Sequence, residues 1–150
     1  MTDKEVKELA NLMLKQSGLA DKGWRFYINM NRSRLGVCNY RKQHIEISAY
    51  HLTSEPAEIR NTLLHEIAHA LVGPYVQAHG REWRQKALEI GCNGQRCGKM
   101  DAPSKYIGTC PKCNTTVKRN RMTQGLRAAT HVTCGASRAR GEYIRWEKVG

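Results

Sequence analysis

Two histidines and a glutamate lie close together in the segment His65-Glu66-Ile67-Ala68-His69. Residues four apart lie nearly above one another on an α-helix, so both imidazoles can reach one metal ion if this segment is helical. Glu66 points about 100° around the helix axis from His65, which makes it a poor ligand but a good neighbour for a metal-bound water. The pattern predicts a catalytic zinc site that still lacks one protein ligand.

The missing ligand is predicted to be His79, ten residues beyond His69. Gly73-Pro74 predicts that the helix ends between the two, because proline cannot continue a helix and glycine suits its C-terminus. A chain that turns back after this break can bring His79 to the metal. Glu82 is the reserve candidate. The three other histidines flank a predicted strand or lie in the C-terminal segment, and are less suitable.

Hydrolysis of a peptide bond is the chemistry expected of such a site. Zinc lowers the pKa of its bound water, and Glu66 can take the proton as the water attacks a carbonyl and later pass it to the leaving amine. Tyr75, in the loop before His79, is a candidate for stabilising the oxyanion. The alternative is that His65 and His69 are ordinary residues of a core helix. The agreement of helix, helix end and third histidine favours the metal site.

A second metal site is predicted in the C-terminal segment. Cys110-x-x-Cys113 is typical of one half of a zinc ribbon, and His131-x-x-Cys134 is the best candidate for the other half. A set of three cysteines and one histidine is chemically sound, because an imidazole nitrogen can replace a thiolate at tetrahedral zinc. His131 could instead contact phosphate.

Three cysteines remain outside these pairs. Cys92 and Cys97 can pack as apolar side chains, pair with each other or compete as ligands, and we prefer packing or mutual pairing. Cys38 lies in a predicted strand and is expected to be buried.

Three helices are predicted from capping and periodicity. A capping box at Thr2-x-x-Glu5 begins the first, which ends at Ser17-Gly18. Ser54 is predicted to cap the helix that carries the histidines, with Pro56 in its first turn. A third helix is predicted over residues 80–90. The apolar positions expected to pack in the first two helices are Val6, Leu9, Leu12, Met13, Ile59, Leu63, Ile67 and Ala70.

Three short strands are predicted between the first two helices. Trp24, Phe26, Ile28 and Met30 alternate with polar or exposed positions, which indicates a strand with one buried face. Two further strands, over 36–40 and 44–48, are joined by a turn at residues 41–43.

The positive charge of the chain is concentrated in its last third. Residues 104–150 hold 10 Lys and Arg against 2 Asp and Glu, a net charge of +8 out of +12 for the whole chain. Such a segment indicates a polyanionic partner, most simply DNA, bound through its backbone without strong sequence preference. A merely solvated surface is the alternative. The cations expected to contact nucleic acid are Lys118, Arg119, Arg121 and Arg127.

The active-site motif resembles that of the SprT-like family of zinc metalloproteases, to which the DNA-dependent Spartan proteases belong. The resemblance is carried by His65-Glu66-x-x-His69 followed by His79-Gly80-x-x-Trp83, where Trp83 replaces the phenylalanine usual in the family. It implies that His65, His69 and His79 bind the catalytic zinc and that Glu66 is the base. It also implies proteolysis of proteins bound or crosslinked to DNA, and many members end in a zinc ribbon.

We therefore expect an α+β fold, with a small zincin-like metalloprotease domain of three strands plus helices over residues 1–103 and a basic zinc ribbon over 104–150. The expected cofactors are one catalytic and one structural Zn²⁺. The expected partners are DNA, either single-stranded or bound without sequence specificity, and proteins bound to that DNA.

No apolar stretch is long enough to cross a membrane, and no secretory signal is seen, which predicts a cytoplasmic, DNA-associated protein. The alternatives are a protease for one regulatory protein and a non-catalytic, zinc-stabilised DNA-binding protein.

Overall fold

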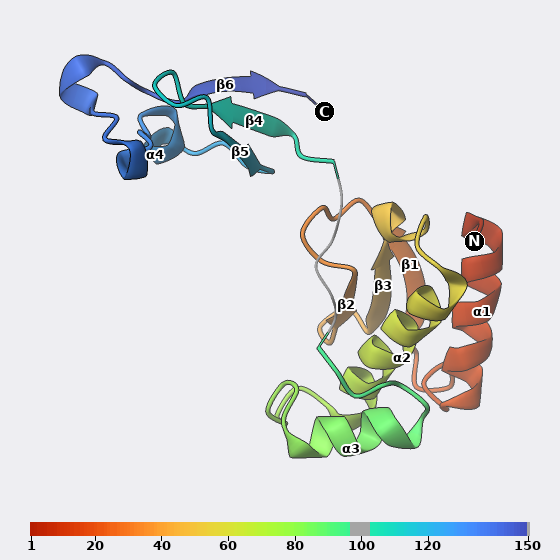
Figure 1. The fold of residues 1–150 in the computed structure, drawn as a ribbon. Coiled ribbons are helices and arrows are strands. Elements are labelled where there is room, and N and C mark those ends of the chain that lie inside the picture. The colour runs from red at the N-terminus through yellow and green to blue at the C-terminus, as the bar shows by residue number, and fades with distance from the viewer. Residues whose placement is uncertain (97–102, 150) are drawn as a thin grey trace. The chain divides into compact units, whose positions relative to one another are not determined.

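The computed structural model describes residues 1–96 and 103–149, which belong to two compact units, Met1–Ala102 and Pro103–Gly150 (Figure 1). We call them unit 1 and unit 2. The fold is α+β, as predicted. Unit 1 contains α1 (Asp3–Gln16), β1 (Arg25–Asn29), β2 (Gly36–Asn39), β3 (His44–Ser48), α2 (Pro56–Val72) and α3 (Arg81–Glu89). Unit 2 contains β4 (Tyr106–Thr109), β5 (Thr116–Arg119), α4 (Gln124–Arg127) and β6 (Arg145–Lys148).

The sheet of unit 1 has the strand order β1-β3-β2. The predicted hairpin is present as the antiparallel pair β2 and β3, while β1 lies parallel to β3 on its other side. Ile45 and Ile47 of the central strand are fully buried, as their alternation predicts. Since β3 is paired on both sides, β2 lies at an edge of this sheet, and this edge lies beside the helix that carries the histidines.

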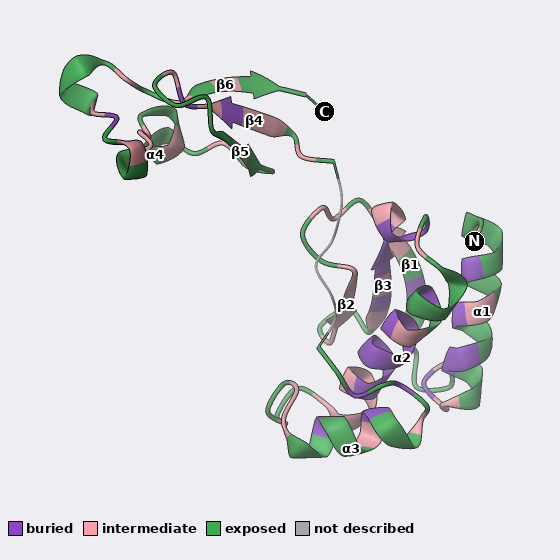
Figure 2. Ribbon diagram, in the orientation of Figure 1, coloured by how far each residue is buried: buried purple, intermediate pink, exposed green. Residues whose placement is uncertain are grey.

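The core of unit 1 lies between this sheet and the helices (Figure 2). Helix α1 begins with the predicted capping box between Thr2 and Glu5, and α2 ends at Gly73, whose φ of 85° only glycine adopts without strain. Helix α2 is the most buried of the helices α1, α2 and α3. Its buried residues include the apolar Ile59, Leu63 and Ile67 together with the polar His65 and Glu66. Burying a glutamate in a core helix costs folding free energy unless the carboxylate is paired, so such a residue is usually kept for a function.

The positions of Leu12, Met30 and Ser54 differ from expectation. Leu12 and Met30 were expected to pack inward, but both side chains are more than half exposed. The strand ends at Asn29, so Met30 has no sheet to pack on. Ser54 does not cap α2, whose N-cap is Glu55, because the Ser54 hydroxyl lies 2.9 Å from Nδ1 of His51 instead.

His51 is a buried histidine with both ring nitrogens in hydrogen bonds, Nδ1 to Ser54 Oγ and Nε2 to Thr62 Oγ1, each at 2.9 Å. Burial lowers the pKa of His51, although the nearby Glu58 acts in the opposite direction. The folded state therefore holds this imidazole neutral below the pH at which the unfolded chain would protonate it.

We expect the free energy of unfolding to fall as the pH drops below about 6.5, because only the unfolded chain takes up a proton at His51 there. The slope due to one such group is at most about 1.4 kcal/mol per pH unit. Urea denaturation at pH 7.5 and 5.5 measures it. His51→Gln should lose less stability than the wild type between these pH values, and an equal loss in both proteins would contradict the assignment.

Unit 2 is a three-stranded antiparallel sheet in the order β5-β4-β6. Gly108 lies at its centre, where a Cβ would come within 2.8 Å of the Trp146 ring, so the indole packs directly on the backbone of β4. The Trp146 indole N–H donates to the carbonyl of Leu126 at 2.8 Å, which fixes α4 to the sheet. Val132 and Tyr143 are exposed in this unit.

None of the helices in the described part of the chain is long and apolar enough to cross a membrane.

Candidate metal centre and its cleft

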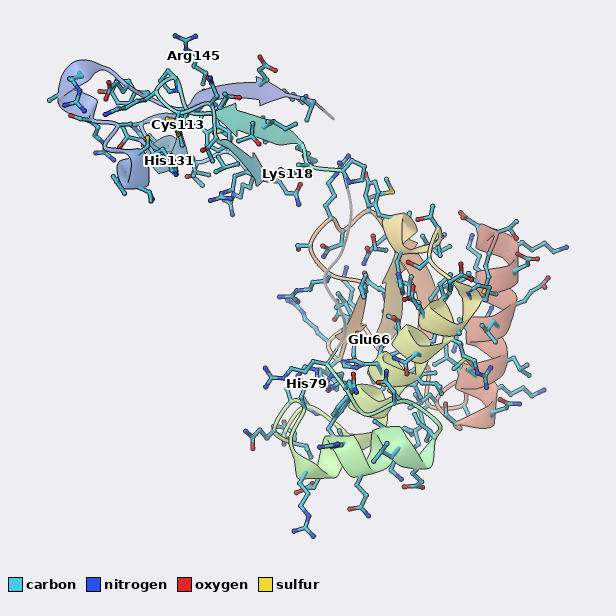
Figure 3. All side chains as sticks on the ribbon, viewed as in Figure 1. Glu66, His79, Cys113, Lys118, His131 and Arg145 are labelled. Carbon is cyan, nitrogen blue, oxygen red and sulfur yellow. The ribbon has the colours of Figure 1, made fainter. Side chains whose placement is uncertain are left out.

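Three imidazoles converge on one point in unit 1. His65 and His69 project from adjacent turns of α2, and His79 comes from the loop just before α3, with its Nε2 atom 3.0 Å from that of His65 and 3.2 Å from that of His69. Figure 3 shows Glu66 and His79 close together at this place. The structure thus brings His79 to the two helical histidines. The reserve candidate Glu82 is exposed on α3 and lies outside the group.

These distances fit a metal ion. Tetrahedral zinc with Zn–N bonds of about 2.0–2.1 Å holds its nitrogens about 3.3 Å apart. When three neutral imidazoles present Nε2 to one point, their nitrogens cannot all be paired as hydrogen-bond donor and acceptor. A cation bound between them accepts a lone pair from each nitrogen and so avoids this problem. Nδ1 of His65 is buried and makes no hydrogen bond within the described residues.

All three histidines are held in the neutral form that binds metals. Burial, followed by the nearby His69 and His79, lowers the pKa of His65 to about 4. Burial, followed by His79, lowers the pKa of His69 to about 4. The pKa of His79 is also lowered, first by burial and then by the positive charge of Arg96.

Trp83 supports all three ligands. Its ring centroid lies 4.6, 5.2 and 4.8 Å from those of His65, His69 and His79. The ring is almost completely buried, so α3 packs against α2 through the metal site itself. His79 has a φ of 59°, a region that few residues other than glycine adopt, and such backbone strain is concentrated at functional positions.

Glu66 lies beside this group with only 6 % of its surface exposed. Burial raises the pKa of its carboxyl to about 7, while the backbone of Cys38 and the charge of Arg34 act in the opposite direction. A cation held by the three imidazoles would also lower the pKa of Glu66, because a nearby positive charge favours the ionised carboxylate. The carboxyl is therefore placed where it can exchange a proton near neutral pH.

The position of Glu66 depends on Gly36 of β2. A Cβ at residue 36 would lie 2.8 Å from both Cγ and Oε1 of Glu66 and 3.0 Å from Cγ2 of Thr62. These distances are too short for real Cβ contacts, so the absence of a side chain lets the edge strand approach the glutamate.

We expect Gly36→Ala to lower kcat/KM for peptide hydrolysis by about 10²-fold, because a displacement of about 1 Å in a reacting group has effects of this size. Zinc content should not change. Gly125→Ala is the matched control, since nothing lies within 4 Å of the Cβ it would add. Peptidase assays with metal analysis measure both. Full activity in Gly36→Ala would show that the observed position of Glu66 is not required.

The histidines and Glu66 open into a cleft of about 520 Å³. One wall is the segment that leads into and forms β2, residues 33–38, and the other includes Pro74, Val76 and Ala78 of the loop before α3. Arg34 and Arg96 line it as well, and the sequence patterns did not single them out. They come from a loop before the sheet edge and from a segment beyond α3, so only the folded chain brings them together.

Two tyrosines, Tyr75 and Tyr40, differ in their position relative to the cleft. Tyr75 is fully exposed and does not line the cleft, so it is not placed as the oxyanion stabiliser. Tyr40 does line it, and its hydroxyl donates to the carbonyl of His69 at 3.0 Å. Burial raises the pKa of Tyr40 to about 12, so it remains a hydrogen-bond donor to the last turn of α2.

A second group of metal-ligating atoms lies in unit 2. Cys110, Cys113, His131 and Cys134 present ligand atoms that all lie within 4.8 Å of one another. Sγ of Cys110 is 3.6 Å from Sγ of Cys134, and Sγ of Cys113 is 3.1 Å from Nδ1 of His131. Figure 3 shows Cys113 and His131 side by side. Tetrahedral zinc with Zn–S bonds of about 2.3 Å would hold two sulfurs about 3.8 Å apart, so the group fits such an ion.

Thr115 prepares Cys113 for this role. Its hydroxyl lies 3.2 Å from Sγ, and its hydrogen bonds lower the pKa of the Cys113 thiol to about 6, which favours the thiolate that binds metals. Burial raises the pKa of Cys134, and its neighbours Cys113 and Cys110 add to this effect.

The remaining cysteines lie elsewhere. Cys92 is a free cysteine packed in the core of unit 1, and Cys97 lies outside the described residues. Cys38 is only partly buried, contrary to expectation, and lines the cleft, where burial followed by the charge of Glu66 raises the pKa of its thiol to about 12.

The four cations predicted to contact nucleic acid are all exposed in unit 2, but they do not all lie on one face of its sheet. Lys118 and Arg119 are neighbours on β5 and therefore point to opposite faces of the sheet. Arg121 follows that strand, and Arg127 ends α4. The strand register adds a cation that spacing alone did not reveal, because Arg119 and Lys148 both pair with Tyr106 and share its face.

Comparison with known proteins agrees with this geometry. No curated protein was found to match the chain. The family model described as SprT-like matches residues 4–124, which cover the three histidines, Glu66 and the first cysteine pair. Since this match covers well over half of the sequence, the chain belongs to the SprT-like family, a family of metalloprotease-type domains.

Proposed function

We propose that the protein is a Spartan-related zinc endopeptidase that cuts proteins bound or crosslinked to DNA, and that unit 2 is a zinc ribbon that binds the DNA. The observation that carries the proposal is the buried Glu66 beside three converging neutral imidazoles. A purely structural metal site has four protein ligands and needs no buried carboxylate beside it.

The residues of unit 1 suit peptide hydrolysis. His65, His69 and His79 would hold the zinc, which when bound acts as a Lewis acid and makes a water a stronger nucleophile. Glu66 takes the proton from the attacking water and delivers it to the leaving amine. Tyr40 holds the carbonyl of His69 and so fixes the end of the helix that carries two ligands.

The edge strand explains how an extended substrate would bind. In the part of the chain that the structure describes, β2 is paired only with β3, and Gly36, Val37 and Cys38 line the cleft. An extended peptide can add to such an edge through main-chain hydrogen bonds, which bind any sequence and place its backbone beside the histidines.

The charge of unit 2 supports the proposed DNA contact. Its cations outnumber its acids five to one, and Arg119, Lys148 and Tyr106 share one face of its sheet. Phosphate contacts of this kind depend steeply on salt and only weakly on sequence.

We expect Arg119→Ala/Lys148→Ala, which removes two cations from one face of the sheet, to make the slope of log affinity against log salt for single-stranded DNA less steep by about 1.4, roughly 0.7 for each lost phosphate contact. Fluorescence anisotropy with a labelled oligonucleotide measures it. Lys7→Ala/Lys22→Ala, which removes two exposed lysines of unit 1, is the matched control. Equal slopes in all three proteins would exclude the face shared by Arg119, Lys148 and Tyr106 from the proposed DNA surface.

The function is tested with a protein crosslinked to single-stranded DNA, incubated with the zinc-loaded chain or with Glu66→Gln. Cleavage that requires DNA and is lost in the variant supports the proposal. Cleavage that is indifferent to DNA would point to a protease for a specific partner. No cleavage by either protein, with DNA binding intact, would leave a non-catalytic DNA-binding protein.

A further inference from the structure

Among the residues that the structure describes, the lining of the cleft of unit 1 has more cations than acids. It includes Arg34 and Arg96, and in the same described ranges its one acidic residue is the buried Glu66. The charge of Arg34 acts on Glu66, and the charge of Arg96 acts on His79. Each arginine therefore lies close enough to the reacting centre to interact with residues beside a scissile bond.

Both arginines are available to a substrate. Neither forms an ion pair with any residue in the ranges 1–96 and 103–149, and both are exposed. Other exposed cations of this protein, such as Lys4 and Arg140, do pair with nearby acids. Two arginines that line one cleft and have no ion-pair partner among the described residues are therefore suited to recognise carboxylates of a substrate.

The loop that carries Arg34 is held in place by a network of asparagine side chains. Oδ1 of Asn31 accepts hydrogen bonds from the backbone N–H of Ser33 at 2.8 Å and from that of Arg34 at 3.1 Å. Oδ1 of Asn29 accepts from the backbone of Asn31 at 2.9 Å. Because its backbone is fixed, Arg34 needs to order little more than its own side chain when it binds.

We infer that Arg34 and Arg96 determine specificity, and that the cleft selects peptide segments with aspartate or glutamate next to the scissile bond. The inference rests on the proposed peptidase function. It also bears on where a DNA-bound protein would be cut. Acidic segments are repelled by phosphates and face away from DNA, so an acid-selective cleft would act on the accessible side of its substrate.

The test uses pairs of peptides that differ only by Glu or Gln at one position flanking the cleavage site, with the zinc-loaded full chain and saturating single-stranded DNA. The wild type should show kcat/KM about five- to tenfold higher for the Glu peptide, the size expected of a partly solvated charge pair. The ratio should approach one in Arg34→Met/Arg96→Met. Arg34→Glu should reverse it and favour Lys over Gln at the same position.

Arg60→Met is the matched control, because Arg60 is an exposed arginine of α2 that does not line the cleft, and it should keep the wild-type ratio. Cleavage of both peptides at equal rates by the wild type would overturn the inference and leave the peptidase function standing. A double variant that loses DNA stimulation while its Glu/Gln ratio stays at the wild-type value would also overturn it, and would assign these arginines to nucleic acid. Failure to cleave any peptide, matched by Glu66→Gln, would instead refute the peptidase function.

Discussion

Glu66→Gln should lower kcat for peptide hydrolysis by about 10²–10⁴-fold, the contribution of a well-placed general base. The amide has nearly the shape of the carboxyl but cannot accept the proton of the attacking water. The three imidazoles are unchanged, so zinc content should match that of the wild type. Peptidase kinetics and metal analysis on the same preparations measure both quantities.

The substitution should not cost stability. Glu66 is almost fully buried, and a neutral amide avoids the desolvation penalty of a buried charge. We therefore expect the free energy of unfolding to be unchanged or slightly higher. Functional residues often reduce stability, so replacing them can stabilise a protein. Loss of activity accompanied by loss of zinc or of stability would contradict a role limited to proton transfer.

Cys110→Ala should abolish the folded structure of unit 2. In residues 103–149, the only buried apolar side chains are those of Cys110 and Ala136, far too few to offset the conformational entropy of folding. Structural zinc contributes about 10–16 kcal/mol of apparent binding free energy at neutral pH, which is large enough to replace a core. The variant should lose one zinc per chain and the dispersed amide NMR signals of unit 2.

Cys92→Ala is the matched control for this experiment. Cys92 is also buried, but in the core of unit 1 and outside both groups of metal ligands. It should keep both zinc ions and the signals of unit 2. A folded unit 2 in Cys110→Ala, with unchanged metal content, would show that the cysteine group does not hold the fold together.

The sequence predicted best what is decided locally. The capping box of α1 and the end of α2 at Gly73 depend on a few neighbouring residues, and both are present as predicted. The edge position of β2 and the approach of Gly36 to Glu66 could not be predicted, because they follow from the order of strands in the sheet. Ser54 failed as a helix cap for the same reason, since a tertiary partner, His51, takes its hydroxyl.

The same division holds for the site. His65 and His69 lie on one face by helix geometry alone, and His79 could be expected because the chain must turn back within ten residues. The contacts of Trp83 with all three imidazoles depend on how α3 packs against α2. Arg34 and Arg96 are far apart in sequence, and no periodicity links them.

The ligands of each metal group come from one short stretch of chain, residues 65–79 in unit 1 and 110–134 in unit 2. Closing such short loops costs little entropy, and neither group needs a residue from the other unit. During synthesis, the histidine group can therefore be completed and loaded while the cysteine segment is still being translated. The protein can acquire its proposed hydrolytic centre before it acquires the segment proposed to bring that centre to DNA.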